Sequence, residues 1–357
     1  MLKKFISILI CLVILLQMMF TTACVSEREK TKFNQYYFDY FDTATVITGY
    51  FETKEEFDIV CDDIEKQLEE YHKLYDIYYR YDGINNLVTI NDVVDGEHKE
   101  VQVDDKIIDM LLFAKEMYNK TDGMVNVAMG SVLRIWHNYR SRGIDDPQDA
   151  SLPKIEKLRE AAKHTDIDDV IVDTENKTVF LADPEMRLDV GAIAKGYTVE
   201  RIAENLENKG ITSIILNVGG NIRTIGLNGQ NEPFKAGIEN PDKDNKEVPH
   251  IEYLELTDMA VVTSGSYQRF YTVDGVNYHH IIDPETLMPG TNFKSVSVVT
   301  DDSGLGDALS TALFLMDEEE GRNLIESFDN AEVMWVLNDG TQHYSSGFSS
   351  YTFEYNP

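Results

Sequence analysis

Two oxygen-bearing side chains, Asp307 and Thr311, are spaced four residues apart in a segment of helical character. Residues at that spacing share one face of a helix. A carboxylate and a hydroxyl are hard oxygen donors, which suit Mg2+ when substrate phosphate and water complete its octahedron. The pair indicates a magnesium site, although an isolated pair of this kind is more often a helix cap followed by an incidental threonine.

Two segments of small residues could bring the backbone close to a phosphate. Residues 189–196 read Asp-Val-Gly-Ala-Ile-Ala-Lys-Gly and lead from a strand end into a helix. Small residues permit close approach, and a helix N-terminus favours anions. The segment is neither a Walker loop nor a Rossmann fingerprint, so a tight strand-to-helix corner explains it equally well. Residues 217–221, Asn-Val-Gly-Gly-Asn, are better explained by a turn that needs positive φ.

A pair of histidines, His279 and His280, stands at a strand end before Asp283-Pro284. Successive side chains of a strand point to opposite faces, so one histidine at most is expected to be functional. An Asp-Pro pair commonly opens a turn, and Asp283 alone therefore carries little weight.

The N-terminus has the pattern of an export signal. A basic start at residues 1–4 precedes an apolar run over 5–20, small residues at 21–23, and Cys24. The run is shorter than the roughly 20 residues of a membrane-spanning helix. Thr-Thr-Ala-Cys at 21–24 resembles a bacterial lipobox, which usually has leucine at the first position. We expect a signal peptide over 1–23 and an exported protein anchored through lipid on Cys24 to the outer face of the bacterial cell membrane; ordinary secretion is the alternative.

The composition excludes several classes of protein. With 32 basic and 63 acidic residues the chain has a net charge of −31, which argues against binding nucleic acid or an anionic membrane surface electrostatically. An acidic protein that handles a pyrophosphate needs a cation to offset repulsion. Only Cys61 remains besides Cys24 once the signal leaves, so no disulfide framework can form and core burial must stabilise the fold.

The hydrophobic pattern predicts an α+β fold of mixed sheets with packed helices. Polar residues after Cys24 predict a tether over 24–35, followed by one domain over 36–357. Helices are expected at about 54–78, 104–119, 194–209 and 305–316, and strands at 41–51, 170–172, 178–181, 211–218, 270–273, 276–279, 295–300 and 332–337.

Five segments in register give the chain a resemblance to the ApbE-type FAD:protein FMN transferases, which are exported flavin-handling lipoproteins with a T-fold-related architecture. They are Phe41-Asp42-Thr43, residues 189–196, Thr263-Ser264-Gly265, His280-Ile281-Ile282-Asp283-Pro284, and residues 307–311. The resemblance runs from about Phe41 to the C-terminus. The sequence departs from the family pattern at Val125-Asn126, at Ala128 and at Leu287, where the family commonly has Phe-Asp, threonine and glycine.

The resemblance implies a set of site residues. Mg2+ would be held by the Ala192 carbonyl, the Asp307 carboxylate and the Thr311 hydroxyl. FAD would be contacted at Phe41, Tyr81, Met124, Val125, Asn126, Asp189, Lys195 and His280. The departures put the flavin contact near residue 126 in question and leave the metal pair intact.

The implied reaction is the Mg2+-dependent transfer of FMN from FAD to a threonine or serine hydroxyl of an acceptor protein, with release of AMP. His280 is our candidate for the base, because imidazole titrates near neutrality, and Asp283 either orients it or makes the turn. Two other functions remain open. Attack by water would make the protein an FAD pyrophosphatase giving FMN and AMP, and a non-catalytic flavin-binding lipoprotein would need no metal pair. The acceptor, a membrane redox subunit or an exported flavoprotein, lies on another molecule.

Overall fold

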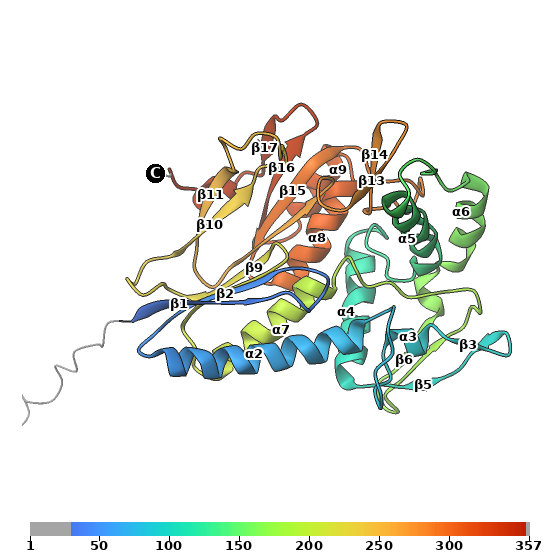
Figure 1. Cartoon of the computed structure of the whole chain (residues 1–357), viewed down its shortest axis with the longest axis horizontal. Helices are drawn as coiled ribbons and strands as arrows, with labels where there is room; N and C mark the ends of the chain where they lie inside the picture. The colour runs from blue at the N-terminus through green and yellow to red at the C-terminus, as the bar shows by residue number, and fades with distance from the viewer. Residues whose placement is uncertain (1–29, 355–357) are drawn as a thin grey trace, which may run out of the picture.

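The computed structural model describes residues 30–354 and is built on an eight-stranded sheet (Figure 1). All neighbouring strands are antiparallel, and their order is β1-β2-β8-β9-β12-β15-β16-β17. The strands are β1 (Thr31–Tyr37), β2 (Thr45–Phe51), β8 (Ser213–Val218), β9 (Asn221–Gly226), β12 (Ala260–Gly265), β15 (Phe293–Thr300), β16 (Ala331–Leu337) and β17 (Gln342–Tyr344).

Four helices cover one face of the sheet: α2 (Lys54–Tyr75), α7 (Ala194–Asn208), α8 (Ser303–Leu315) and α9 (Glu318–Ile325). α2 is amphipathic, and its buried side chains recur at helical spacing from Phe57 to Tyr75. Thr53 and Glu56 begin the helix with a reciprocal capping box. Burial raises the pKa of Cys61 in this helix to about 12, so its thiol is inert.

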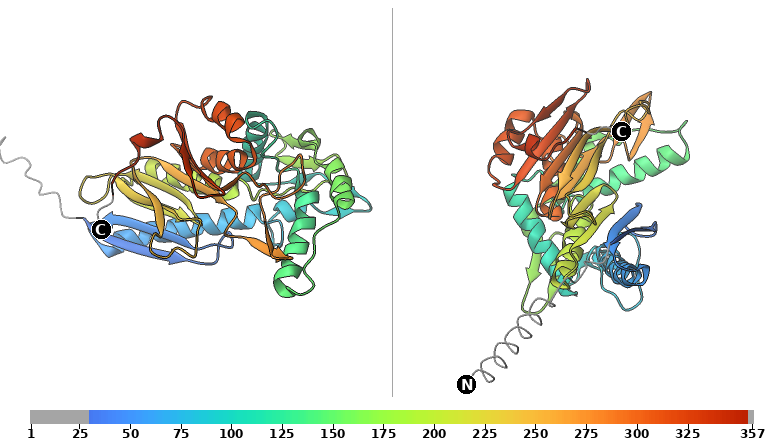
Figure 2. Two further views of the ribbon diagram at one scale, coloured as in Figure 1. Left: turned by 90° about the horizontal axis from the view of Figure 1, so that it is seen from above. Right: turned by 90° about the vertical axis from the view of Figure 1, so that its left-hand side faces the viewer.

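A two-stranded sheet, β10 (Phe234–Glu239) and β11 (His250–Leu256), covers the opposite face (Figure 2). Its apolar side chains pack on Val261 of β12 and Val299 of β15. The neighbouring residue Val298 points to the helical side, where it joins a separate apolar cluster. The central strands are therefore buried on both faces, which explains the adjacent valines at 261–262 in β12 and 298–299 in β15.

A smaller part of the fold packs beside α8 (right side of Figure 1). It contains α3 (Leu87–Ile90), α4 (Asp105–Lys120), α5 (Gly130–Asp145), α6 (Ile155–Ala161), the 3-10 turns η1 (Ala162–His164) and η2 (Ile167–Asp169), the hairpin β3 (Val93–Val94)–β4 (Glu97–His98), the sheet β5 (Val101–Gln102)–β7 (Thr178–Leu181)–β6 (Val170–Asp173), and the hairpin β13 (Phe270–Val273)–β14 (Val276–His279). A last 3-10 turn, η3 (Phe348–Ser350), packs under β10 and β11. Trp136 of α5 and Tyr271 of β13 belong to one buried cluster, which ties this hairpin to α5.

The predicted fold class is confirmed, and most predicted helices and strands begin or end within a few residues of those observed. Two expectations were wrong in detail. Residues 31–35, expected in the tether, lie in β1 and pair with β2. Residues 41–44 are not part of a strand, because Phe41 and Asp42 have positive φ and turn the chain between β1 and β2. The sequence pattern did not reveal α5 or β9 to β12.

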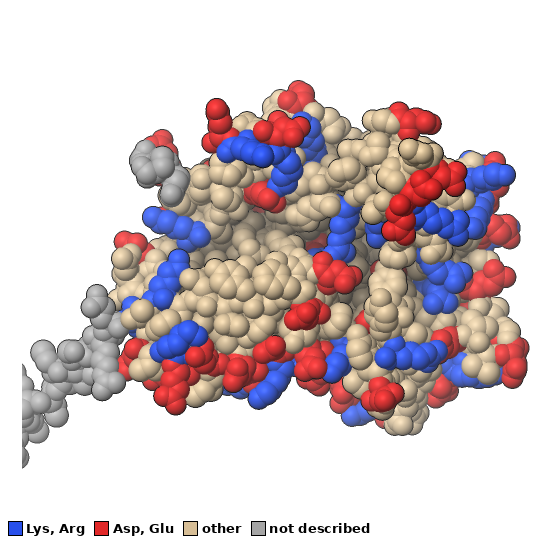
Figure 3. All heavy atoms as spheres, in the orientation of Figure 1, with Lys and Arg blue, Asp and Glu red and all other residues tan. Residues whose placement is uncertain are grey.

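Acidic side chains crowd the surface over α2, whereas the adjoining surface over β1 and β2 is largely uncharged (Figure 3). Among residues 30–354, no helix has the length and apolar character needed to cross a membrane. Cys24 and the signal segment lie outside the described residues.

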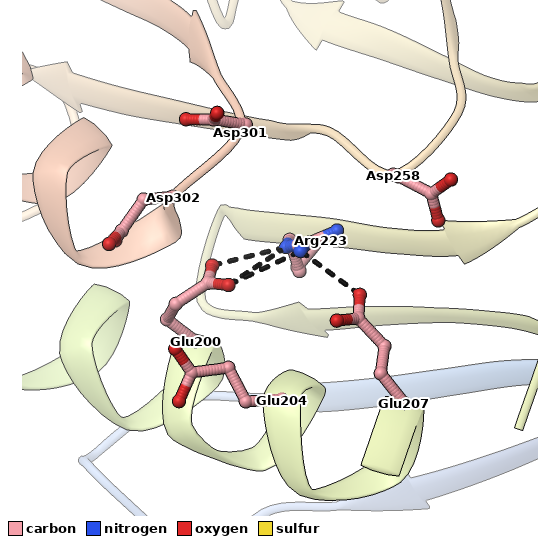
Figure 4. Close-up of a pocket in the computed structure, with 7 residues that line it drawn as sticks. All are labelled: Glu200, Glu204, Glu207, Arg223, Asp258, Asp301 and Asp302. Carbon is pink, nitrogen blue, oxygen red and sulfur yellow. Dashed lines mark hydrogen bonds and ion pairs between the residues drawn. The ribbon is translucent and has the colours of Figure 1, made fainter. Parts of the chain in front are cut away.

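A buried ion pair joins α7, β9 and α8. Glu200 and Arg223 are each 5% exposed, and the Nε of Arg223 lies 3.1 Å from Oε2 of Glu200. The same carboxylate accepts a hydrogen bond of 2.7 Å from the backbone N–H of Ser303, the first residue of α8. Figure 4 shows Arg223 between Glu200 and Glu207, in a cavity of about 590 Å³ otherwise lined by Glu204, Asp258, Asp301 and Asp302. Burial raises the pKa of Glu200 in spite of its cationic partner.

We predict that Arg223→Met lowers the free energy of unfolding by about 3–5 kcal/mol, because it leaves the Glu200 carboxylate buried without a counter-ion. Denaturant unfolding measures the loss. Adding Glu200→Gln to this variant should recover part of it. Glu204→Gln, on the same helix at a half-exposed position, is the matched control. An Arg223→Met loss no larger than that of the control would contradict the prediction.

Candidate active site

One cavity, of about 400 Å³, brings together most residues predicted to be functional. Its walls come from the β1–β2 connection, the N-terminus of α7, the face of α8, one side of α5, and the base of the β13–β14 hairpin. The predicted residues that line it are Met124, Asn126, Asp189, Ala192, Lys195, His280, Asp307 and Thr311.

The contact between α7 and α8 sets the position of Asp307. A Cβ at Gly196 would lie 2.2 Å from the carbonyl oxygen of Ser303 and 2.4 Å from the Cβ of Asp307, so only glycine allows this approach. The N–H of Gly196 donates a hydrogen bond of 2.8 Å to Oδ2 of Asp307. The carboxylate therefore sits at the N-terminus of α7, where the helix dipole favours a negative charge.

Asp307 is 5% exposed, and burial raises the pKa of its carboxyl. Lys195 opposes this rise, since its Nζ lies 3.7 Å from Oδ2. No hydrogen bond from residues 30–354 reaches Oδ1. One carboxylate oxygen is thus held by the protein, while the other remains available to a ligand.

The hydroxyls beside Asp307 provide further hard oxygen donors. Ser264 of β12 places its Oγ 2.9 Å from Oγ of Ser310 and 3.4 Å from Oγ1 of Thr311. In the described part of the chain no group of three or more His, Cys, Asp or Glu side chains is placed to hold a metal. A cation here would depend on one carboxylate, hydroxyl and backbone oxygens, and substrate, which is the donor set that suits Mg2+ bound with a phosphate.

The Gly219-Gly220 turn joins β8 to β9, with φ of 58° and 93° at the two glycines. The expectation of a turn needing positive φ is therefore confirmed. Gly219 also lines the cavity, and a Cβ there would lie 2.4 Å from Oγ1 of Thr43. The turn closes the cavity against the β1–β2 connection.

The two histidines lie in different surroundings, as was predicted, although β14 ends at His279 and His280 follows the strand. His279 is buried: its Nδ1 accepts a hydrogen bond from the N–H of Ile281, and its Nε2 lies 2.7 Å from the carbonyl oxygen of Gly290. Its bonds are satisfied within the fold. His280 lines the cavity instead, with Nδ1 3.3 Å from the carbonyl oxygen of Arg269. Because a carbonyl only accepts, Nδ1 carries the proton and Nε2 is the basic nitrogen.

Asp283 does not orient His280. Its carboxylate accepts hydrogen bonds from the N–H groups of Glu285 and Thr286 at 2.7 and 3.2 Å, which is the turn-forming alternative. The backbone carbonyl of Arg269, and not Asp283, orients the imidazole of His280. Burial lowers the pKa of His280 to about 3, with Arg140, Arg269 and Lys195 adding to the effect. The imidazole is neutral at pH 7 in the free protein.

Three predicted flavin contacts lie outside the cavity lining. Tyr81 donates a hydrogen bond of 2.8 Å to Asp76, and its oxygen lies 3.4 Å from Nε2 of His72. Phe41 packs edge-on against the same histidine, with ring centroids 5.5 Å apart. Val125 is 1% exposed and belongs to the main core. The three side chains are thus engaged in packing and hydrogen bonds within the fold.

The departures from the family pattern have structural explanations. Asn126 lines the cavity, but its amide is bonded within the protein, to the Thr165 carbonyl and the Ala128 N–H, both at 2.9 Å. Ala128 is fully buried. Leu287 has a φ of 62°, in the region that favours glycine. Its side chain is 5% exposed, and burying a leucine contributes about 1.5–3 kcal/mol, enough to offset a strain of about 1–2 kcal/mol.

Several lining residues were missed from the sequence. Leu133, Trp136, His137 and Arg140 recur at helical spacing along α5, which the pattern did not predict. Tyr78, Gln268 and Arg269 come from connections between elements. Asp42 and Thr43 line the cavity where Phe41 had been expected. Recognising the stripe on α5 would have been the one available signal.

Comparison with known proteins places the chain in a family. The sequence model of the ApbE family matches residues 41–335. An FAD:protein FMN transferase of Treponema pallidum is 32% identical over 69% of this chain and 70% of its own length, and one of Klebsiella pneumoniae is 29% identical over 74% and 81%. The ApbE protein of Thermotoga maritima superimposes with a TM-score of 0.77 at 27% identity, covering 91% of this chain and 100% of that protein. The flavin transferase ApbE of Vibrio cholerae gives 0.75 at 26% identity, with coverages of 90% and 99%. The protein belongs to the ApbE family.

We predict that Gly196→Ala lowers the free energy of unfolding by about 1–3 kcal/mol, because its methyl group overpacks the contact between α7 and α8. Asp307 moves as a result, so catalytic activity should fall as well. Calorimetry and an activity assay measure the two effects. Gly321→Ala in α9 is the matched control, since its nearest contact is a flexible leucine atom at 3.2 Å. Equal behaviour of the two variants would refute this account of the contact.

Proposed function

We propose that the protein transfers FMN from FAD to a threonine or serine hydroxyl of an acceptor protein and releases AMP. The observation that carries the proposal is the shared cavity of Asp307, Thr311, Lys195 and His280, in a chain of the ApbE family. A small-residue segment and a helix N-terminus border the same cavity, and both suit a pyrophosphate.

Magnesium fits the oxygen donors of this cavity. Asp307, Thr311 and the backbone carbonyl of Ala192 would hold it. When bound, Mg2+ neutralises the developing charge of a pyrophosphate during phosphoryl transfer. Lys195 and the N-terminus of α7 orient the Asp307 carboxylate, and Asp307 is 5% exposed.

His280 is the group that would accept the proton. Its Nδ1–H is engaged by the carbonyl of Arg269, which leaves Nε2 free. The acceptor hydroxyl oxygen forms a bond to the phosphorus on the riboflavin side, the pyrophosphate P–O bond breaks, AMP departs, and the hydroxyl proton goes to Nε2. A bound pyrophosphate opposes the three cations that depress the pKa of His280, so substrate binding should make the imidazole a stronger base.

The decisive experiment mixes the protein with Mg2+, a candidate acceptor domain, and either FAD or FMN. We expect covalent flavin fluorescence on a denaturing gel, together with one AMP per label, from FAD alone. FMN has only a terminal phosphate and so lacks the AMP leaving group. Labelling from FMN would refute the mechanism. AMP release without labelling would identify a pyrophosphatase, and binding without either would identify a flavin carrier.

We predict that Asp307→Asn lowers activity by more than about 100-fold, since even groups that only support metal ligands are worth 10–100-fold. Excess chelator should have the same effect on the unaltered protein, and added Mg2+ should reverse it. Asp301→Asn, in the separate acidic cavity, is the control expected to retain activity. Full transfer by Asp307→Asn, or in chelator, would remove the case for a metal.

We also propose that Cys24 is the lipidated first residue of the mature protein and anchors it at the outer face of the bacterial cell membrane. The sequence at 21–24 and the signal-like segment before it support this. Cys24→Ala should shift the protein from the membrane fraction to the soluble fraction. Mass spectrometry of the mature N-terminus gives the direct test, and an unacylated form that starts elsewhere would contradict it.

A further inference from the structure

Two arginines, Arg140 of α5 and Arg269 before β13, face the cavity and make no ion pair with the described residues, although Asp42, Asp189 and Asp307 line the same cavity. Arg140 makes a hydrogen bond of 3.1 Å to Nδ1 of His137. Arg269 donates to the backbone carbonyls of Asp42 at 3.0 Å and Phe41 at 3.5 Å. These partners are neutral. Among residues 30–354 neither guanidinium has an ion pair within 4 Å, although a guanidinium carries five N–H donors.

Unpaired arginines are unexpected in a chain with nearly twice as many acidic as basic residues. Lys195, the third cation of the cavity, already lies beside Asp307. Arg140 is half-buried, and both burial and the like charge of Arg269 lower its pKa, although Tyr78 and Asp189 act in the opposite direction. Such an arrangement is unfavourable in the free protein and becomes favourable when an anion binds between the two guanidinium groups.

We propose that Arg140 and Arg269 form an anion-binding pair for the phosphates of the dinucleotide, a subsite separate from the oxygen donors at Asp307 and Thr311. The inference rests on the proposed function for the identity of the ligand. It assigns the two arginines to ground-state binding and to neutralising the charge that develops during transfer. Arg269 also has a second role, because its backbone carbonyl fixes the tautomer of His280.

Geometry favours phosphate over other acidic or polar ligands. The arginines and Lys195 line the same cavity as His280, and the backbone carbonyl of Arg269 lies 3.3 Å from Nδ1 of its imidazole, so the three cations surround the group that must lie near the reacting phosphorus. A planar guanidinium binds phosphate oxygens in a bidentate manner. If the two arginines instead contacted the flavin ring or an acidic residue of the acceptor protein, the measured ligand affinities or the KM for the acceptor would change in a different way.

The test compares ligands that differ only in a phosphate, using the full-length protein with Mg2+: AMP against adenosine, and FMN against riboflavin. Isothermal titration measures each affinity. In the double variant Arg140→Gln/Arg269→Gln we expect the advantage of the phosphorylated ligand to fall at least tenfold in one or both pairs. Adenosine and riboflavin should change less than twofold. Arg134→Gln, on the same helix but outside the cavity lining, is the control expected to bind like the unaltered protein.

Three results would overturn the proposal. Both phosphate advantages could persist in the double variant, or riboflavin could lose as much affinity as FMN. In a parallel assay of FMN transfer, the double variant could instead raise only the KM for an acceptor domain. The second result assigns the arginines to the flavin ring and the third to the acceptor. Failure of the proposed function is distinguishable, because then the unaltered protein would show no phosphate advantage or no transfer from FAD.

Discussion

The arrangement of the site depends on the contact between the first turns of α7 and α8. Gly196 and Glu200 are four residues apart on α7, and both meet Ser303: the glycine makes room for its carbonyl, and the glutamate accepts its N–H. The backbone of Ser303 therefore contacts α7 through both its N–H and its carbonyl. Asp307, one turn further along α8, is brought to the N–H of Gly196 as a consequence. A methyl group added at Gly196, or the loss of the Glu200 charge, would therefore displace the Asp307 carboxylate.

Electrostatics gives the cavity a character unlike that of the rest of the protein. The chain is strongly acidic, and carboxylates dominate both the surface over α2 and the separate cavity around Arg223 (Figures 3 and 4). The active-site cavity instead balances Arg140, Lys195 and Arg269 against Asp42, Asp189 and Asp307, and the three cations lie near a neutral imidazole. The cavity is therefore less acidic than the surface over α2, and an anionic substrate bound in it would raise the basicity of His280.

Local sequence was sufficient for many elements and for part of the site. The hydrophobic repeat of α2, the glycine that ends α7 and the Asp-Gly turn between β13 and β14 each act over a few residues, so their signals survive in the sequence. The Asp307 and Thr311 pair was readable for the same reason, since helical spacing alone puts both on one face. The different surroundings of His279 and His280 were also predicted, although β14 ends at His279 and His280 follows it.

Tertiary structure decided what depends on residues distant in the sequence. The helical spacing of Arg140 with its neighbours on α5 was readable, but no local pattern could show that this stripe faces the site, or that a carbonyl of Arg269 rather than Asp283 would hold His280. The order of the sheet places β12 between β9 and β15, and this brings Ser264 to α8. Sequence by itself determined the family, the elements and the chemical types available. Strand order and helix packing determined which side chains meet, because those contacts join segments that are tens to hundreds of residues apart.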